Sequence, residues 1–210
     1  ARAIQLDELL AETPIDTLKD YLRWQTANSF APWLSKPFAD ADFAFYDQTM
    51  RGQKEQQDRW KRCTSATDRA FSHPLGKLYV ERAFAGDSKK IAKDLIARVE
   101  TSFEKILPTL AWMDDTTRER AVGKVKAIYN KIGYPDTWRD YKGLKLGETF
   151  FEKLVAARTF NYEYRASKYG KPVKRDEWRG GPPVVNASYS GTRNEMWFPA
   201  GILQAPFFDK

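Results

Sequence analysis

The chain has 210 residues, a formal net charge of +7, a hydrophobic content of 42% and seven tryptophans. This length and apolar content can bury a substantial core and fit one or two domains. No run is long and apolar enough to span a membrane, and the single cysteine excludes an internal disulfide. Basic and acidic residues are interleaved without a DNA- or RNA-reading motif, so we expect a solvated charged surface and no nucleic-acid partner.

The N-terminal third of the chain predicts helices. A helical pattern starts with the first residues, which is typical of a chain entered partway through a larger protein. The next helix is predicted from Thr13, which can cap it, with Pro14 in its first turn. Residues 38–60 predict a long helix, and 58–70 predict a further one. Residues 75–84 are apolar and predict a helical or mixed segment.

A strong amphipathic helix is predicted next, capped by Asp87 or Ser88. Its apolar residues recur at three- and four-residue spacing, which is the pattern of one helix face. These residues are Ile91, Leu95, Val99, Phe103, Ile106 and Leu110. We expect Pro108 to kink the helix near its end.

Two more helices follow in the sequence. Thr116 and Glu119 have the spacing of a capping box, and residues 122–132 continue the helix with an apolar stripe. Gly133 suits the position just after a helix end. A last helix is predicted at 148–169. The aromatic residues on these stripes are best interpreted as core.

The C-terminal segment changes character at residues 176–183, where helical periodicity gives way to glycines and prolines. Residues 183–189 and 193–198 then have strand composition, with turn residues at 190–192 between them. This pattern predicts a β-hairpin.

The fold class predicted from these elements is mainly α. We expect a multi-helix body over residues 1–178, followed by a hairpin element over 179–210. One strand of that hairpin is expected to lie at a sheet edge. An edge strand presents unpaired backbone groups on which an extended peptide can dock, and Asn186 could add side-chain hydrogen bonds. A purely structural hairpin, with Asn186 in a turn or bulge, stays open as the alternative.

Catalytic and metal-binding residues are not predicted in this chain. A His-Glu-x-x-His zinc site needs two histidines, and His73 is the only one. We interpret His73 as a loop histidine at a helix boundary. Cys63 follows two cations that could lower its pKa, but a lone buried cysteine is the favoured interpretation. No group of ligating residues has metal-site spacing.

The last part of the sequence resembles a known family. Residues 186–208 contain Asn-Ala-x-Tyr, a turn, and then Asn-x-x-x-Phe-Pro-Ala-Gly-Ile-Leu-Gln-x-Pro-Phe-Phe. This pattern is similar to the segment before the zinc helix of neprilysin-family metallopeptidases. Arg-Trp-x-x-Cys at 59–63, Leu-Gly-x-Leu-Tyr-Val at 75–80 and Lys-Ile-Gly-Tyr-Pro at 131–135 follow the family's order. The resemblance covers essentially the whole chain and corresponds to the portion upstream of His-Glu-x-x-His.

The resemblance implies a zinc endopeptidase acting on oligopeptides, with the hairpin belonging to a zincin-like catalytic domain. Asn186 and Ala187 match the pair that holds the substrate backbone. Zinc would be bound by a partner polypeptide or missing segment, and this chain alone would be inactive. A periplasmic or secreted location is implied as well. A catalytically inactive peptide-binding or interaction module is the alternative.

Four positions depart from the family pattern. Ser188 stands where an aromatic residue often follows Asn-Ala, and Met196-Trp197 stands where small aliphatic residues are usual. Ala205 replaces a common proline. The side-chain preference next to the Asn-Ala pair therefore does not carry over to this chain.

Overall fold

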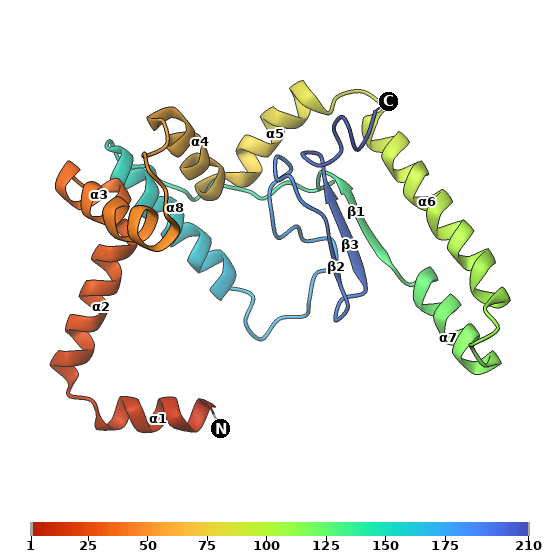
Figure 1. The fold of residues 1–210 in the computed structure, drawn as a ribbon, viewed down its shortest axis with the longest axis horizontal. Coiled ribbons are helices and arrows are strands. Elements are labelled where there is room, and N and C mark those ends of the chain that lie inside the picture. The colour runs from red at the N-terminus through yellow and green to blue at the C-terminus, as the bar shows by residue number, and fades with distance from the viewer. Residues whose placement is uncertain (1, 210) are drawn as a thin grey trace. The chain divides into compact units, whose positions relative to one another are not determined.

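The structure is a computed structural model that describes residues 2–209. It is mainly α with a small β element, which confirms the predicted fold class. The α-helices are α1 (Arg2–Glu12), α2 (Ile15–Phe30), α3 (Lys36–Asp42), α4 (Arg59–Ala70), α5 (Ser72–Ala83), α6 (Ser88–Ile106), α7 (Asp115–Lys126) and α8 (Phe150–Ala166). The strands are β1 (Tyr129–Gly133), β2 (Ser188–Ser190) and β3 (Glu195–Pro199). Figure 1 shows their order along the chain.

Contacts divide the chain into two compact units. One contains the residues up to Lys61 together with Thr149–Phe151, and the other contains Arg62–Glu148 and Glu152–Lys210. In the first unit, the rings of Phe30 and Phe151 meet edge to face with 5.2 Å between their centroids. The predicted division between residues 178 and 179 stays a prediction. None of the helices in residues 2–209 has the length and apolarity needed to cross a bilayer.

Two predictions for the first unit were wrong. Thr13 does not cap α2, because its hydroxyl donates to the Leu9 carbonyl at 2.6 Å and Pro14 occupies the N-cap position. In place of the long helix predicted over residues 38–60, the structure has a shorter one that begins earlier, at Lys36. It starts as α3, passes into a π-helix at Phe43–Thr49, and gives way to Gly52, whose φ of 71° a helix cannot accommodate.

Helices α4, α5 and α8 lie where the sequence predicted helices. Helix α6 ends at Ile106, and Pro108 lies in the 3₁₀ turn that follows it. The predicted capping box of α7 was wrong. Asp114 is the N-cap, and its carboxylate accepts the backbone N–H of Thr117 at 2.7 Å. That hydrogen bond lowers the pKa of Asp114.

The largest difference from the prediction lies at residues 129–133, which form strand β1 rather than the end of a helix. Helix α7 ends at Lys126, and β1 pairs in parallel with β3, with Ile132 opposite Phe198. Apolar residues at mixed spacing fit a helix or a strand equally well in a short segment. A partner more than 60 residues away along the chain decides in favour of the strand.

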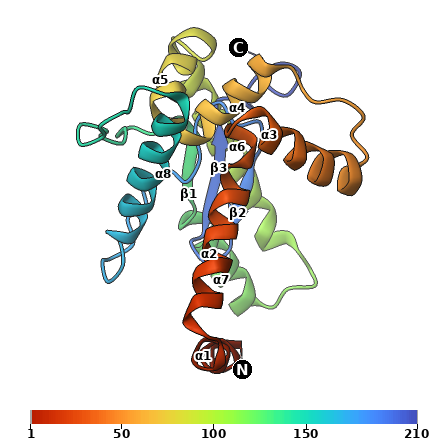
Figure 2. The same ribbon diagram turned by 90° about the vertical axis from the view of Figure 1, so that its left-hand side faces the viewer.

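The three strands form one sheet in the order β1–β3–β2 (Figures 1 and 2). Strands β2 and β3 form the predicted antiparallel hairpin, in which Ser188 lies opposite Trp197 and Ser190 opposite Glu195. The first strand of the hairpin is shorter than predicted, since pairing begins at Ser188. Strand β3 is central, so β2 lies at one edge of the sheet.

One face of the sheet carries the core of the second unit. Its buried members are Val80, Phe84, Ala92, Ile132 and Ala200. They come from α5, α6, β1 and the segment after β3, so the sheet is fixed against two helices. At the end of β1, Gly133 has a φ of 75°, and an added Cβ would lie 2.7 Å from the Phe84 ring. Only glycine fits there without displacing Phe84.

Candidate peptide-binding edge

Strand β2 presents the candidate site. Asn186 and Ala187 lie directly before this strand and are both exposed. The side-chain oxygen of Asn186 accepts the backbone N–H of Ala187 at 2.8 Å. The structure therefore places the two predicted site residues together at the start of an edge strand. They lie outside the ladder between β2 and β3, which begins at Ser188.

The segment that leads into Asn186 is tightly held. The backbone N–H of Gly201 donates to the Pro182 carbonyl at 2.8 Å. An added Cβ on Gly201 would lie 2.4 Å from the Pro183 oxygen, and one on Gly76 would lie 2.4 Å from Pro182 Cδ. These close approaches need glycine, and they fix the start of the exposed segment against its neighbours.

The hairpin turn is fixed from the other end. Asn194 has a φ of 47°, in the left-handed region that asparagine tolerates. Its amide accepts the Tyr189 hydroxyl at 2.9 Å and donates to the Lys124 carbonyl at 2.9 Å. Arg175 donates to the Arg193 carbonyl at 3.0 Å. Both ends of β2 are thus anchored. Among the described residues, the side of β2 that faces away from β3 has no neighbouring strand.

The second face of the sheet is polar and carries a buried ion pair. Lys131 Nζ lies 2.8 Å from Glu195 Oε2, and the two side chains are 2% and 7% exposed. Lys131 also donates to the Glu177 carbonyl at 2.7 Å. Burying both charges is costly unless they are paired and hydrogen-bonded. The pair therefore fixes the position of the loop around residue 177 over β1 and β3.

A pocket of about 280 Å³ opens on this polar face, beside β2. It is lined by Lys131, Arg179, Gly180, Ser188, Ser190, Glu195 and Trp197. The indole nitrogen of Trp197 is buried and has no hydrogen-bond partner within the described residues. Because Ser188 and Ser190 of β2 line the pocket, it is continuous with the edge strand that carries the candidate site.

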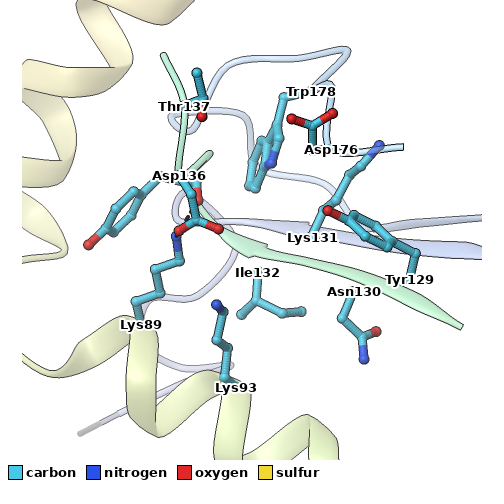
Figure 3. Close-up of a pocket in the computed structure, with 11 residues that line it drawn as sticks. Lys89, Lys93, Tyr129, Asn130, Lys131, Ile132, Asp136, Thr137, Asp176 and Trp178 are labelled. Carbon is cyan, nitrogen blue, oxygen red and sulfur yellow. Dashed lines mark hydrogen bonds and ion pairs between the residues drawn. The ribbon is translucent and has the colours of Figure 1, made fainter. Parts of the chain in front are cut away.

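A second, smaller pocket of about 50 Å³ lies along β1 (Figure 3). Lys89 points to Asp136 in this view, and its Nζ lies 2.6 Å from Oδ1 of Asp136 and 2.7 Å from the Tyr134 carbonyl. The hydrogen bond from Lys89 lowers the pKa of Asp136. The space left suits a few water molecules rather than a peptide side chain.

Glu177 links the loop over the sheet to helix α8 and its end. Its carboxylate accepts the Tyr164 hydroxyl at 2.9 Å and also the ammonium group of Lys168. Burial raises the pKa of Glu177, but these hydrogen bonds outweigh burial and the pKa lies below its usual value. Glu177 is therefore ionised near neutral pH and anchors the loop.

His73 and Cys63 have structural surroundings. His73 lies in the first turn of α5, as predicted for a helix boundary, but it is buried rather than on a loop. Burial and the nearby Arg139 lower the pKa of His73 to about 4, so the ring is neutral near pH 7. Cys63 is half-buried in α4.

The described residues do not fit a zinc ion. Within residues 2–209, no three His, Cys, Asp or Glu side chains gather in a way that could hold a metal. The one histidine has its Nδ1 facing the backbone N–H of Arg139 at 3.5 Å. Zinc sites in proteins use three or four such ligands, so the described residues do not form one by themselves.

Sequence reasoning missed two features of the site. The Lys131–Glu195 pair joins residues 64 positions apart, and only the unpredicted β1–β3 pairing brings them together. The signal present in the sequence was a lysine inside an apolar stripe. The pocket beside Trp197 was also missed, although Ser188 and Trp197 both depart from the family pattern. Because Ser188 lies opposite Trp197 in the hairpin, the two departures lie side by side at the same pocket.

Comparison with known proteins identifies the family. The model of Peptidase family M13 matches residues 3–135, which is more than half of the chain. This chain belongs to peptidase family M13.

Relatives of this M13 chain cover almost all of it. Endothelin-converting enzyme 1 of Mus musculus is 39% identical over an alignment 214 residues long, which covers 98% of this chain and 28% of that protein. The endothelin-converting enzyme homolog of Locusta migratoria is 36% identical over 91% of this chain and 27% of that protein. The chain thus spans less than a third of the curated relatives it matches.

Solved structures give the same result. Mycobacterium tuberculosis zinc metalloprotease Zmp1, in complex with an inhibitor, has a TM-score of 0.86 and 35% identity over 98% of this chain and 31% of that chain. PepO from Lactobacillus rhamnosis HN001 has a TM-score of 0.76 and 25% identity over 87% of this chain and 29% of that one. The resemblance found in the sequence motifs to the neprilysin family is confirmed.

Proposed function

We propose that this chain is the non-zinc portion of a neprilysin-like zinc metalloendopeptidase that hydrolyses peptide bonds in oligopeptides. The observation that carries the proposal is the exposed Asn186–Ala187 pair at the start of edge strand β2, in a chain of family M13. In this proposal zinc is held by the portion of the peptidase that carries His-Glu-x-x-His and a further Glu ligand. A periplasmic or secreted location belongs to the same proposal.

The role of this chain is to align the substrate. An extended peptide adds to the outer edge of β2 through backbone hydrogen bonds, as in other β-strand additions. Ala187 leaves room for the peptide backbone, and the Asn186 amide group offers a donor and an acceptor beside it. Holding the peptide in one orientation next to the metal-bearing portion increases the rate through positioning. The anchored turn at Asn194 and the clamped segment at Pro182 keep this edge in place.

The division of labour is tested by reconstitution. The chain is mixed with the zinc-bearing portion, and intact complexes, bound zinc and hydrolysis of a fluorogenic oligopeptide are measured on the same sample. We expect a complex with about one zinc, active only when both portions are present. Hydrolysis by this chain with zinc alone would contradict the proposal. Peptide binding without hydrolysis in the complete mixture would favour the inactive interaction module.

The alignment role has its own test in the assembled peptidase. Asn186→Ala is expected to lower kcat/KM by about 10- to 100-fold, the effect of losing hydrogen bonds to a bound backbone. Val185→Ala is the matched control, since Val185 is also exposed and adjacent. Its kcat/KM should stay within about 3-fold of the unsubstituted chain, because surface substitutions change little. Equal effects of the two substitutions would remove Asn186 from the site.

A further inference from the structure

The segment that leaves helix α8 is strongly basic. Residues 165–175, which we call the basic loop, contain five basic residues and no acidic one. The five are Arg165, Lys168, Lys171, Lys174 and Arg175. A run of this kind is often only a solvated face, so its exposure, its neighbours and its ion pairs decide whether it fits a partner.

The tip of the basic loop is open to solvent. The backbone N–H of Tyr169 donates to the Ala166 carbonyl at 3.1 Å, which continues the last turn of α8. Gly170 follows with a φ of 72°, a conformation that commonly ends a helix. All residues from 169 to 175 are exposed. Their side chains are therefore available to a partner.

Two apolar side chains lie between the cations of the basic loop. Tyr169 is 86% exposed and Val173 is 67% exposed. A tyrosine ring with its hydroxyl suits the boundary between lipid and water, and an aliphatic side chain gains free energy by leaving water there. Cations interleaved with exposed apolar groups thus fit a surface that is both negatively charged and partly apolar.

Most of the charge of the basic loop is not neutralised. Within residues 2–209, Lys171 and Lys174 form no ion pair. Lys168 is the exception, since its ammonium group binds Glu177. Arg175 donates its hydrogen bonds to backbone carbonyls, which carry no compensating charge. The loop therefore attracts anions.

Arg175 connects the basic loop to the hairpin turn and to α7. It donates to the Arg193 carbonyl at 3.0 Å and to the Ala127 carbonyl at 3.4 Å. Helix α7 ends here with two exposed lysines in its last turn, Lys124 and Lys126. Figure 1 shows the hairpin turn and the end of α7 at the same end of the sheet. The basic loop and the end of α7 thus form one cationic surface, which we call the basic surface.

An extended anionic surface matches this arrangement better than a small anion does. A small anion contacts one or two cations, whereas a charged plane attracts every cation within a Debye length, which is about 10 Å at 0.1 M salt. Single-stranded nucleic acid is bound through bases stacked on aromatic rings, and Val173 offers no such platform. A bilayer with anionic lipids attracts clustered Lys and Arg and also accepts the apolar side chains.

We propose that the basic surface docks on a bilayer that contains anionic lipids, with Tyr169 and Val173 at the level of the headgroups. The contact is peripheral and is made by exposed side chains of the loop and of α7. It goes beyond the proposed function and does not depend on it, because none of these residues aligns the substrate.

The test measures flotation of the full chain with lipid vesicles. One set contains only phosphatidylcholine, and the other contains about one third phosphatidylglycerol, which supplies the negative charge. We expect binding to the anionic vesicles alone, and loss of that binding when salt is raised from about 0.05 M to about 0.5 M. Equal binding to both sets of vesicles, or binding to neither, would overturn the inference.

A charge variant tests the basic loop itself. Lys171→Gln combined with Lys174→Gln should weaken the partition onto anionic vesicles by about 25-fold, at about 5-fold for each cation. The control is Lys142→Gln combined with Lys145→Gln, which gives the same net charge. Its two lysines are exposed and precede α8, whose 17 residues span about 25 Å before the basic loop begins. The control should stay within about 3-fold of the unsubstituted chain. Equal losses in the two variants would overturn the inference.

A second pair of variants tests the apolar contact. Val173→Asp and Val185→Asp make the same change at two sites of similar exposure, 67% and 71%. Val173→Asp should weaken partition about 10-fold more than Val185→Asp, because only Val173 leaves water at the bilayer. Equal effects of the two substitutions would overturn the placement of the loop at the headgroups.

The remaining outcomes separate docking from peptide hydrolysis. The assembled peptidase should still float with anionic vesicles, and loss of flotation would show that the zinc-bearing portion covers the basic surface, which overturns the inference. Tighter binding to single-stranded DNA than to anionic vesicles at the same salt would assign the surface to nucleic acid instead. Without vesicles, the Lys171→Gln and Lys174→Gln variant should hydrolyse a soluble oligopeptide like the unsubstituted enzyme, so docking and the proposed function can fail independently.

Discussion

The two faces of the three-stranded sheet are built in different ways. On one face Ile132 packs with Phe84 and Ala200 into an apolar core between helices. On the other, Lys131 and Glu195 form a buried ion pair, and a pocket remains next to Trp197. Apolar packing fills space and favours any well-shaped neighbour, whereas a buried pair demands one particular partner. The apolar face thus supplies stability, and the buried pair on the polar face specifies the pairing of β1 with β3.

The largest effect on stability is expected from removing one partner of the buried ion pair on the polar face. Lys131→Met should destabilise the fold by about 3 kcal/mol, because the buried Glu195 would lose its hydrogen-bonded partner and keep only Arg193, whose Nη1 lies 3.8 Å from Oε2. Chemical denaturation followed by circular dichroism measures the change.

The matched control is the double substitution Lys131→Met with Glu195→Leu. Because both charges are then removed, most of the lost stability should return. A double variant as unstable as Lys131→Met would show that the pairing is not the cause.

On the apolar face, Ile132→Ala removes packing from the core. Ile132 is 2% exposed, so the substitution leaves a cavity and should cost about 3 kcal/mol in the same denaturation experiment. Ile132→Val should cost only about 1 kcal/mol. The apolar face should therefore tolerate small changes of shape, unlike the charged pair. A loss below 1 kcal/mol for Ile132→Ala would contradict its place in the core.

A pH titration adds a third case, His73 in the first turn of α5, where one buried group titrates. Its folded-state pKa of about 4 is below the ordinary value of 6.5, because burial and then Arg139 disfavour the charged ring, although Glu177 acts in the opposite direction. Stability is therefore fully present above about pH 6.5 and is lost as the pH falls toward 4. The expected loss is about 2–3 kcal/mol.

His73→Gln is the control for this titration, since its amide keeps a hydrogen-bond acceptor and does not titrate. The variant should lose less stability than the unsubstituted chain between pH 7 and pH 4, as measured by the urea midpoint. The carboxylates whose pKa values are lowered, Asp114, Asp136 and Glu177, titrate in both proteins and cancel in the difference. Parallel curves would show that the pKa of His73 is the same in the folded and unfolded states, which would contradict the lowering by burial.

The smallest expected effect concerns the turn that holds β2. Tyr189→Phe removes the hydroxyl that donates to Asn194 at 2.9 Å and should lower the free energy of local opening of the hairpin turn by about 1 kcal/mol. The expected signature is faster amide exchange at residues 188–190 with little change in global stability. Unchanged exchange would mean that the Asn194 hydrogen bond to Lys124 holds the turn by itself.

Local signals predicted much of this fold. Helices α6 and α8 follow the apolar spacing that starts at Ile91 and Phe151, and the hairpin follows its turn residues. The sequence did not predict β1, because Ile132 fits a helix stripe and a strand equally, and the parallel partner Phe198 is far away along the chain. Asp114 was missed as a cap because Thr116 and Glu119 also have capping spacing.

The candidate site was predictable in part. Asn186 and Ala187 follow from the motif and lie at the start of the edge strand. The pocket could not be predicted, since it depends on the cross-strand register of Ser188 with Trp197 and on how closely Gly180 approaches the indole. The buried pair of Lys131 and Glu195 depends on the same long-range pairing. Features that arise between distant segments require the structure.

The measurement that tests the central claim most directly is amide exchange in the assembled peptidase, with and without a non-hydrolysed oligopeptide. If the peptide adds to β2, the outward-facing amides of residues 186–190 should become protected, while the β1 amides of residues 129–133 stay unchanged. Protection elsewhere, with β2 unaffected by saturating peptide, would contradict the claim that this edge aligns the substrate.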